Sequence, residues 1–171
     1  MYRSLHIDHL EARALPSLAP GHAVPISNPG GPIELTHPAH GHVTGSYTSG
    51  MHGVDAGVQD NFTGTGHITR LGNVTATGMI DGVGDAAQGH AMGTLTFTSA
   101  KGSLTIDVTG PVQKMFSPLP QHFHYHVISG TGVDAHVRGT GTLSLNFLIL
   151  DPPAPVSPGM PATGGFVMTI H

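Results

Sequence analysis

Histidines are the most numerous titratable side chains in this sequence, with 14 in 171 residues. The densest group is the segment His122-Phe123-His124-Tyr125-His126. On a β-strand, alternate side chains share one face with about 6.6–6.8 Å between their Cα atoms, so two of these imidazoles can converge on one ion. His136 follows a turn on the expected partner strand and can supply a third. Neutral imidazole suits Zn²⁺ or Cu²⁺, so we take His124, His126 and His136 as candidate metal ligands.

The same segment also has a purely structural interpretation. Phe123, Tyr125 and Val127 have the apolar character of a buried face, which would leave the intervening histidines outside as solvated polar residues. A second group, His37, His40 and His42, lies in a Pro- and Gly-rich stretch, where His-rich tracts bind metals incidentally. The sequence leaves both interpretations of the first group open.

Catalytic motifs of other kinds are not supported. Two Gly-rich strings, Gly82–Ala87 and Gly130–Ala135, match a loose phosphate-binding pattern but do not open a helix inside a βαβ unit, so both are interpreted as turns. No strand–turn–helix GxSxG element is found. Carboxylates are few and dispersed, with Asp81 and Asp85 flanking a loop and Asp107 expected to face outward. The sequence therefore leans against an enzyme.

Composition and charge exclude two classes of partner. Only 9% of residues are charged and the formal net charge is −4, whereas a nucleic-acid binder needs a basic surface to displace counterions. No apolar run approaches the roughly 18 residues of a transmembrane helix. Low net charge also offers little repulsion between copies, so a homo-oligomer is expected.

The first forty residues differ from the rest. Prolines recur every few positions from Pro16 to Pro38, which disfavours both helix and central strand. We predict a largely disordered tail and linker over 1–40, with a short helix near its start, and one β-domain over 41–171. Charged residues interrupt the apolar stretch near the N-terminus, so there is no standard signal peptide.

From about residue 41 the hydrophobic period is 2, as in Leu104, Ile106 and Val108 alternating with polar neighbours. Strict alternation is typical of half-buried antiparallel strands. The predicted strands are 41–49, 61–70, 73–81, 90–98, 102–110, 121–129, 136–149 and 165–171.

Eight short antiparallel strands with glycines inside them favour a closed β-barrel, because closure removes the sheet edges and glycine permits sharp bends. A two-sheet β-sandwich is the alternative. An eight-stranded barrel is just wide enough to be filled by side chains or to hold one small ligand. The inward-facing residues predicted to line such a ligand cavity are Leu95, Phe97, Leu104, Ile106, Leu143 and Leu145.

The segment Leu10-Glu11-Ala12-Arg13-Ala14-Leu15-Pro16-Ser17 resembles the LE-x-R-x-L-x-S element near the start of planctomycete-type exported and surface proteins. This resemblance implies an exported or cell-surface protein. It covers eight residues.

The segments Phe62–Gly66, Gly130–Gly132 and Gly139–Thr142 resemble the glycine-paired hairpins of the allene oxide cyclase and dirigent barrel group. That resemblance implies an eight-stranded antiparallel barrel with a lipophilic cavity, commonly dimeric or trimeric. It carries over no catalytic residues.

The sequence thus predicts a non-enzymatic binding or structural module. The alternatives are a small lipophilic-ligand barrel, as a carrier or a cyclase-like isomerase, and a protein that binds divalent metal through His124, His126 and His136.

Overall fold

The computed structural model describes residues 33–34, 39–52, 57–83, 89–112, 120–148 and 162–171. This part of the chain is built from strands, with one short 3-10 helix, η1 (Gly132–Asp134), and no α-helix. The strands are β1 (Ile33–Glu34), β2 (Gly41–His52), β3 (Gly57–Ile68), β4 (Gly72–Val83), β5 (His90–Ser99), β6 (Gly102–Pro111), β7 (Gln121–Gly130), β8 (Val137–Arg138), β9 (Thr140–Leu148) and β10 (Ala162–Ile170). The all-β prediction is confirmed.

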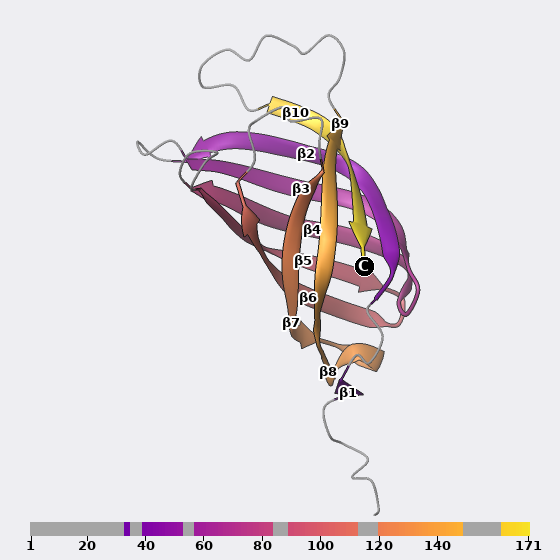
Figure 1. Ribbon diagram of the computed structural model, residues 1–171. Coiled ribbons are helices and arrows are strands. Elements are labelled where there is room, and N and C mark those ends of the chain that lie inside the picture. The colour runs from indigo at the N-terminus through magenta and orange to yellow at the C-terminus, as the bar shows by residue number, and fades with distance from the viewer. Residues whose placement is uncertain (1–32, 35–38, 53–56, 84–88, 113–119, 149–161) are drawn as a thin grey trace, which may run out of the picture.

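Eight of these strands close into one antiparallel barrel in the order β10-β2-β3-β4-β5-β6-β7-β9 (Figure 1). Each strand pairs with the next one along the chain, apart from the short β8, and β10 pairs back onto β2 from Ala162↔Ser49 to Ile170↔Gly41. The barrel prediction is therefore correct and the sandwich alternative is wrong, because closure through β10 leaves the barrel sheet without an edge.

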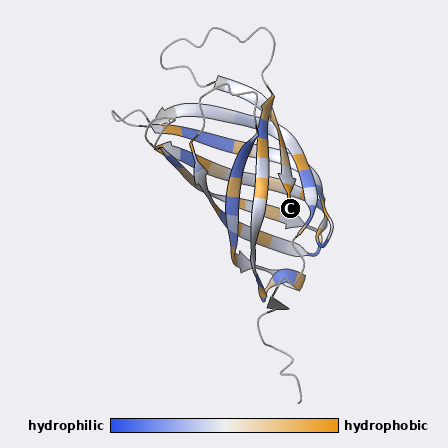
Figure 2. Ribbon diagram, viewed as in Figure 1, coloured by the Kyte–Doolittle hydropathy of each residue, from blue (hydrophilic) through white to orange (hydrophobic). Residues whose placement is uncertain are grey.

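The alternating sequence pattern sets the two faces of the barrel wall. Along β7, Phe123, Tyr125 and Val127 are buried while the histidines between them are exposed. The same alternation gives the banded colouring of the strands in Figure 2. The interior is a continuous apolar core to which every barrel strand contributes.

Two predicted connections are shorter in the structure than the sequence suggested. The gap left between the predicted strands 41–49 and 61–70 is largely strand, because β2 extends to His52 and β3 begins at Gly57. The gap after the predicted strand 73–81 begins two residues later than expected, because β4 extends to Val83. Residues 53–56 and 84–88 lie outside the described part of the chain.

The predicted strand 136–149 is broken near its start. Gly139, with φ of 154°, separates the two-residue β8 from β9, and Gly132, with φ of 61°, opens the 3-10 turn before it. Positive φ favours glycine, so the chain leaves the barrel wall between β7 and β9 instead of turning in a tight hairpin.

Most of the predicted tail and linker lies outside the described residues. Within it, β1 forms a parallel two-residue pairing with β8, Ile33↔Val137 and Glu34↔Arg138. The element Leu10–Ser17 is not described, so export stays a prediction.

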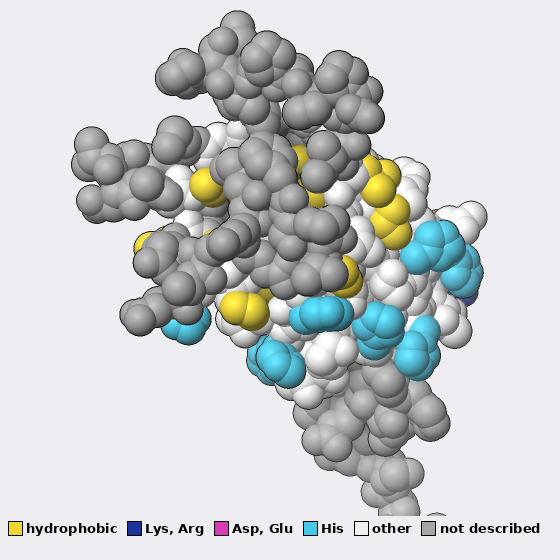
Figure 3. Space-filling view, turned by 45° about the horizontal axis from the view of Figure 1, so that its top comes forward, with side chains coloured by type: hydrophobic (Ala, Val, Ile, Leu, Met, Phe, Trp, Pro, Cys, Tyr) yellow, Lys and Arg dark blue, Asp and Glu magenta, His cyan; other side chains and the backbone are white. Residues whose placement is uncertain are grey.

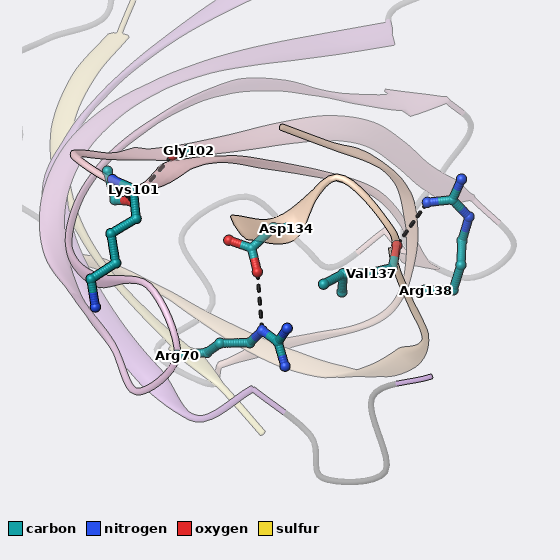
Figure 4. A network of polar contacts seen from close by, with 7 residues as sticks. Arg70, Lys101, Gly102, Asp134, Val137 and Arg138 are labelled. Carbon is teal, nitrogen blue, oxygen red and sulfur yellow. Dashed lines mark hydrogen bonds and ion pairs between the residues drawn. The ribbon is translucent and has the colours of Figure 1, made fainter. Parts of the chain in front are cut away.

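The excursion between β7 and β9 lies at one end of the barrel, where β3–β4 and β5–β6 are also joined; we call it the Asp134 end. Asp134 of η1 is fully buried, and the Nε of Arg70, in the β3–β4 turn, lies 3.0 Å from its Oδ1. The β3–β4 and β7–β9 junctions are on opposite sides of the ring of strands. Figure 4 shows the two side chains pointing toward one another across it, so this ion pair ties opposite walls together.

Neighbouring contacts hold the same excursion in place. The Thr131 Oγ1 accepts a hydrogen bond from the Ser103 backbone N–H at 3.0 Å, and the Val133 N–H donates to the Lys101 carbonyl at 3.1 Å. Leu71 and Val137 are buried beside it. The Asp134 end is thus closed by packing and by polar contacts.

Candidate functional site

The opposite end of the barrel, where β2–β3, β4–β5, β6–β7 and β9–β10 are joined, carries polar groups on its inner face. We call it the Asp60 end. Asp60 shares the inward-facing register of Phe62 and Ile68 on β3. On the neighbouring strand Ser49, which is buried, lies directly opposite Asp60, and Tyr47 lies opposite Phe62. A carboxyl group, a serine hydroxyl and a tyrosine therefore share one patch of the inner wall.

Four aromatic rings lie next to this patch of the inner wall. Tyr47 and Phe147 meet edge to face, with 4.8 Å between ring centroids, and Phe62 meets Phe166 in the same way at 5.3 Å. Phe62 and Phe166 are buried, whereas Tyr47 and Phe147 are half-buried. Edge-to-face contacts at these distances are favourable. The half-buried rings form an aromatic surface near the carboxyl group.

The electrostatic environment of Asp60 disfavours its charge. Burial raises the pKa of the Asp60 carboxyl above its ordinary value of 3.8, and the nearby Asp81 raises it further, while a hydrogen bond from Ser49 acts the other way. Burial also raises the pKa of Tyr47, and the negative charge of Asp60 adds to that shift. Desolvation and like charge both penalise an ionised carboxyl group.

The described cations are all far from this patch along the barrel. Arg70 lies in the β3–β4 turn, Lys101 in the β5–β6 turn and Arg138 in β8, all at the Asp134 end. Within the described part of the chain, Asp60 therefore lacks the kind of partner that Asp134 has.

The inner wall beside β3 has room at Gly82, which lies opposite Val58 and shares the inward register of Ile80 on β4. A methyl group built there would come no nearer than 3.4 Å to Val112 and 3.7 Å to the Val58 carbonyl. At Gly78 and Gly93, deeper in the barrel, it would collide with the backbone of the adjacent strand. A methyl group therefore fits on the inner wall at the Asp60 end, whereas it would not fit at Gly78 or Gly93.

The six residues predicted to line a ligand cavity do face inward, but they are packed. They are Leu95, Phe97, Leu104, Ile106, Leu143 and Leu145, and the most exposed of them, Leu104, is only 6% exposed. They belong to the continuous apolar core and fill the middle of the barrel. If a ligand binds inside this barrel, the groups in reach are those at the Asp60 end.

The predicted metal ligands lie on the outer face. His124 and His126 are exposed on β7, and the cross-strand partner of His126 is Thr140 of β9. His136 is exposed in the turn before β8 and so does not lie opposite His126. Among the described residues, no three His, Cys, Asp or Glu side chains are placed to hold one ion. The register therefore does not assemble the expected trio.

A hollow of about 450 Å³ does occur on this outer face, over β6, β7 and β9. Its walls are two cross-strand rows, Thr109–His124–Thr142 and Asp107–His126–Thr140, with Tyr125 and Gly141 between them. Figure 3 shows histidines gathered along one side of the molecule. Every histidine whose side chain is described is exposed.

Sequence reasoning missed Asp60 because it assigned residues 50–60 to a loop. The signal was present: the alternation Phe62, Gly64, Ile68 can be extended backward through Asp60 to Val58 on the same face. The polar run Gln59-Asp60-Asn61 concealed it.

Comparisons with known proteins add no family to this picture. No family model matches the chain, and neither the curated proteins nor the solved structures contain a significant match. In the described part of the chain no helix is long and apolar enough to span a membrane.

Proposed function

We propose that this protein is a binding barrel that takes a small amphiphilic molecule at the Asp60 end. The apolar or aromatic part of the ligand would contact Tyr47 and Phe147, and an amine or another hydrogen-bond donor would face the Asp60 carboxyl group. This deepens the expectation of a non-enzymatic binding module and moves the ligand from the middle of the barrel to one end.

The observation that carries the proposal is a half-buried carboxyl group on the inner wall with no described cation beside it. Burial of such a group costs free energy unless it is paired. Perturbed carboxyl groups of this kind gather at functional sites, and the mouths of β-barrels are common places for ligands. A cationic head group would supply the missing partner.

Binding is favoured over catalysis by what surrounds the carboxyl group. Ser49 and Tyr47 are its described polar neighbours on the inner wall, and the described histidine side chains all lie on the outside. A serine nucleophile needs an adjacent base within hydrogen-bond reach. The described residues place no imidazole beside Ser49.

The test uses two fluorescent probes of similar apolar character and opposite charge, dansylcadaverine as the cation and anilinonaphthalene sulfonate as the anion. The full chain has no tryptophan, so probe fluorescence can be titrated directly. We expect Asp60→Asn to lower the affinity for the cationic probe about tenfold, a difference of about 1.4 kcal/mol, and to raise the affinity for the anionic probe.

Two further variants complete the experiment. Asp81→Asn is the matched control, because Asp81 lies at the same end but faces outward, where Gln59 donates a hydrogen bond to it at 3.0 Å. Because the charge of Asp81 also acts on Asp60, this variant should change both affinities, but by clearly less than Asp60→Asn does. Gly82→Leu should weaken the binding of both probes by placing a side chain on the inner wall beside β3. Equal effects of the two aspartate variants, or no effect of Gly82→Leu, would overturn the proposal.

A further inference from the structure

Ser144, on the outer face of β9, lies between two imidazoles. Its Oγ is 3.1 Å from the Nδ1 of His122 and 3.3 Å from the Nε2 of His171. These contacts join three different strands or their ends, since His122 is on β7 and His171 directly follows β10.

The backbone fixes both imidazoles at this place. His122 is the cross-strand partner of Ser144. The backbone N–H of His171 donates to the Thr142 carbonyl at 2.9 Å, which continues the β10–β9 pairing by one residue. The two rings therefore approach the same oxygen from opposite sides of β9, and their positions follow from strand register.

Ser144 cannot satisfy both rings in the same way. Its single hydroxyl proton can be donated to one ring nitrogen only, so the other ring must donate its own N–H to the Oγ. A divalent ion has no such restriction, because it accepts the lone pairs of both neutral imidazoles at once. Metal–nitrogen bonds of about 2.0–2.1 Å are shorter than these contacts to the serine oxygen. The two ring nitrogens must therefore move closer to the position that the ion takes.

The chemistry of this position suits a transition metal. Imidazole is a good ligand for Zn²⁺, Cu²⁺ and Ni²⁺, and a site of given ligands binds Cu²⁺ more tightly than the others. The direct cross-strand neighbours of Ser144 are His122 and Thr169, so no lysine or arginine from the paired strands occupies the place of the ion. His124, two residues along β7, is the next imidazole on the same face.

We propose that His122 and His171 bind one divalent transition ion, Cu²⁺ most tightly, in place of their hydrogen bonds to Ser144. Water completes the coordination. This site is independent of the Asp60 end and differs from the expected trio His124, His126 and His136 in that both of its imidazoles contact one side-chain oxygen.

The test is a calorimetric titration of the full chain with Cu²⁺, repeated with Zn²⁺. His122→Ala and His171→Ala should each weaken the tightest site at least tenfold. The double variant should lose less affinity than the product of the two single losses, because either substitution already removes the chelate, and this non-additivity is the signature of two ligands sharing one ion. A single variant that left the affinity of the tightest site unchanged would mean two unrelated surface histidines and would overturn the proposal.

Matched controls separate this site from general binding by a histidine-rich surface. His67→Ala and His136→Ala each remove an equally exposed imidazole and should leave the tightest site unchanged within about twofold. Ser144→Ala should preserve or strengthen binding, because the ion no longer competes with the hydroxyl. A tenfold loss in either histidine control would also contradict the assignment.

A spectroscopic readout checks the ligands directly. At one equivalent of Cu²⁺, the electron paramagnetic resonance spectrum should show coupling to two imidazole nitrogens, reduced to one in either single variant. A spectrum unchanged by His122→Ala would place the ion elsewhere. Asp60→Asn should have no effect on Cu²⁺ affinity, so failure of this site and failure of the proposed ligand site are distinguishable.

Discussion

The two ends of this barrel each carry an inward-lying aspartate, and their surroundings differ. Asp134 is fully buried, and its Oδ1 accepts a hydrogen bond from the Nε–H of Arg70. Asp60 is less buried, has Ser49 as its hydrogen-bond donor and has Asp81 as a like-charged neighbour. Among the described residues, the carboxyl group at one end therefore has a cationic partner and the carboxyl group at the other end does not.

The difference shows what each carboxyl group does for the protein. The Asp134 ion pair joins the β3–β4 turn to the β7–β9 excursion on the opposite side of the ring, so its partner comes from within the fold. At the Asp60 end the described chain offers no such partner, and the surrounding aromatic rings are only half-buried. We interpret the first as a structural clamp and the second as a position left for a ligand.

The largest expected effect comes from removing the arginine of the clamp. Arg70→Ala leaves the Asp134 carboxylate, whose side chain is 1% exposed, buried without its cation, and should lower the free energy of unfolding by about 3 kcal/mol. Urea unfolding followed by circular dichroism measures it.

The double variant sharpens this result. Arg70→Ala with Asp134→Ala should be less destabilised than Arg70→Ala alone, because no unpaired buried charge remains. Arg138→Ala is the control, since the hydrogen bond described for that side chain is to the neighbouring Val137 carbonyl. A double variant less stable than Arg70→Ala would contradict the clamp.

A smaller effect distinguishes how tightly the two ends are packed. Gly141 and Gly164 each lie against a tyrosine ring, and an added methyl group would collide with Tyr125 and with Tyr47, respectively. Tyr125 is buried, whereas Tyr47 is half-buried. Gly141→Ala should therefore cost about 2 kcal/mol and Gly164→Ala clearly less. Equal losses in thermal or urea unfolding would remove the distinction.

A third prediction concerns the contacts that hold the excursion at the Asp134 end. Thr131→Val keeps the shape of the side chain but removes its hydrogen bonds to the Ser103 N–H and hydroxyl group, at 3.0 and 2.8 Å. These contacts are exposed to solvent, so we expect a loss of about 1 kcal/mol. Ser129→Ala, at an exposed position on β7, should be neutral by comparison. If Thr131→Val left the free energy of unfolding unchanged, the backbone contacts alone would be enough to hold the excursion in place.

The smallest effect is a pH dependence with a definite sign. The pKa of folded Asp60 is raised above its ordinary value of 3.8, so the folded protein binds this proton more tightly than the unfolded chain does. Its contribution to the free energy of unfolding is therefore most favourable below that ordinary value and is lost as the pH rises through the folded pKa. Asp60→Asn removes this contribution.

The measurement is the difference in free energy of unfolding between Asp60→Asn and the original protein. As the pH is raised from about 3.5 to about 7, the free energy of unfolding of the variant should increase relative to that of the original protein. The same series with Asp107→Asn, at an exposed position on the outer face of β6, is the control. A difference that moved in the opposite direction would mean that the Asp60 charge is stabilised in the fold, contrary to the contrast between the two ends.

Much of this fold could be predicted from local pattern. Alternation along Leu104, Ile106 and Val108 gave strands and their faces, because the period of 2 is a property of each strand by itself. The same reasoning placed the histidines of β7 outside. It failed where backbone conformation depends on particular glycines, as at Gly132 and Gly139, and so it missed the excursion that carries Asp134.

The candidate sites were beyond the reach of local pattern. The pKa of Asp60 is raised by burial inside the closed barrel and by Asp81, and Ser49 opposes that rise; both residues come from other strands. The expected pairing of His136 with His126 failed because the chain leaves the barrel between them, which puts Thr140 opposite His126.

The sequence by itself determined that the chain would be all-β, that the apolar residues of each strand would share one face, and that histidine and hydroxyl side chains would coat the other. Only the tertiary structure decided that Arg70 would meet Asp134 from 64 residues away, that Asp60 would lie without a described cation, and that two imidazoles would meet at Ser144. The physical reason is that side-chain alternation is set within one strand, whereas register, barrel closure and burial are set by pairings between distant strands.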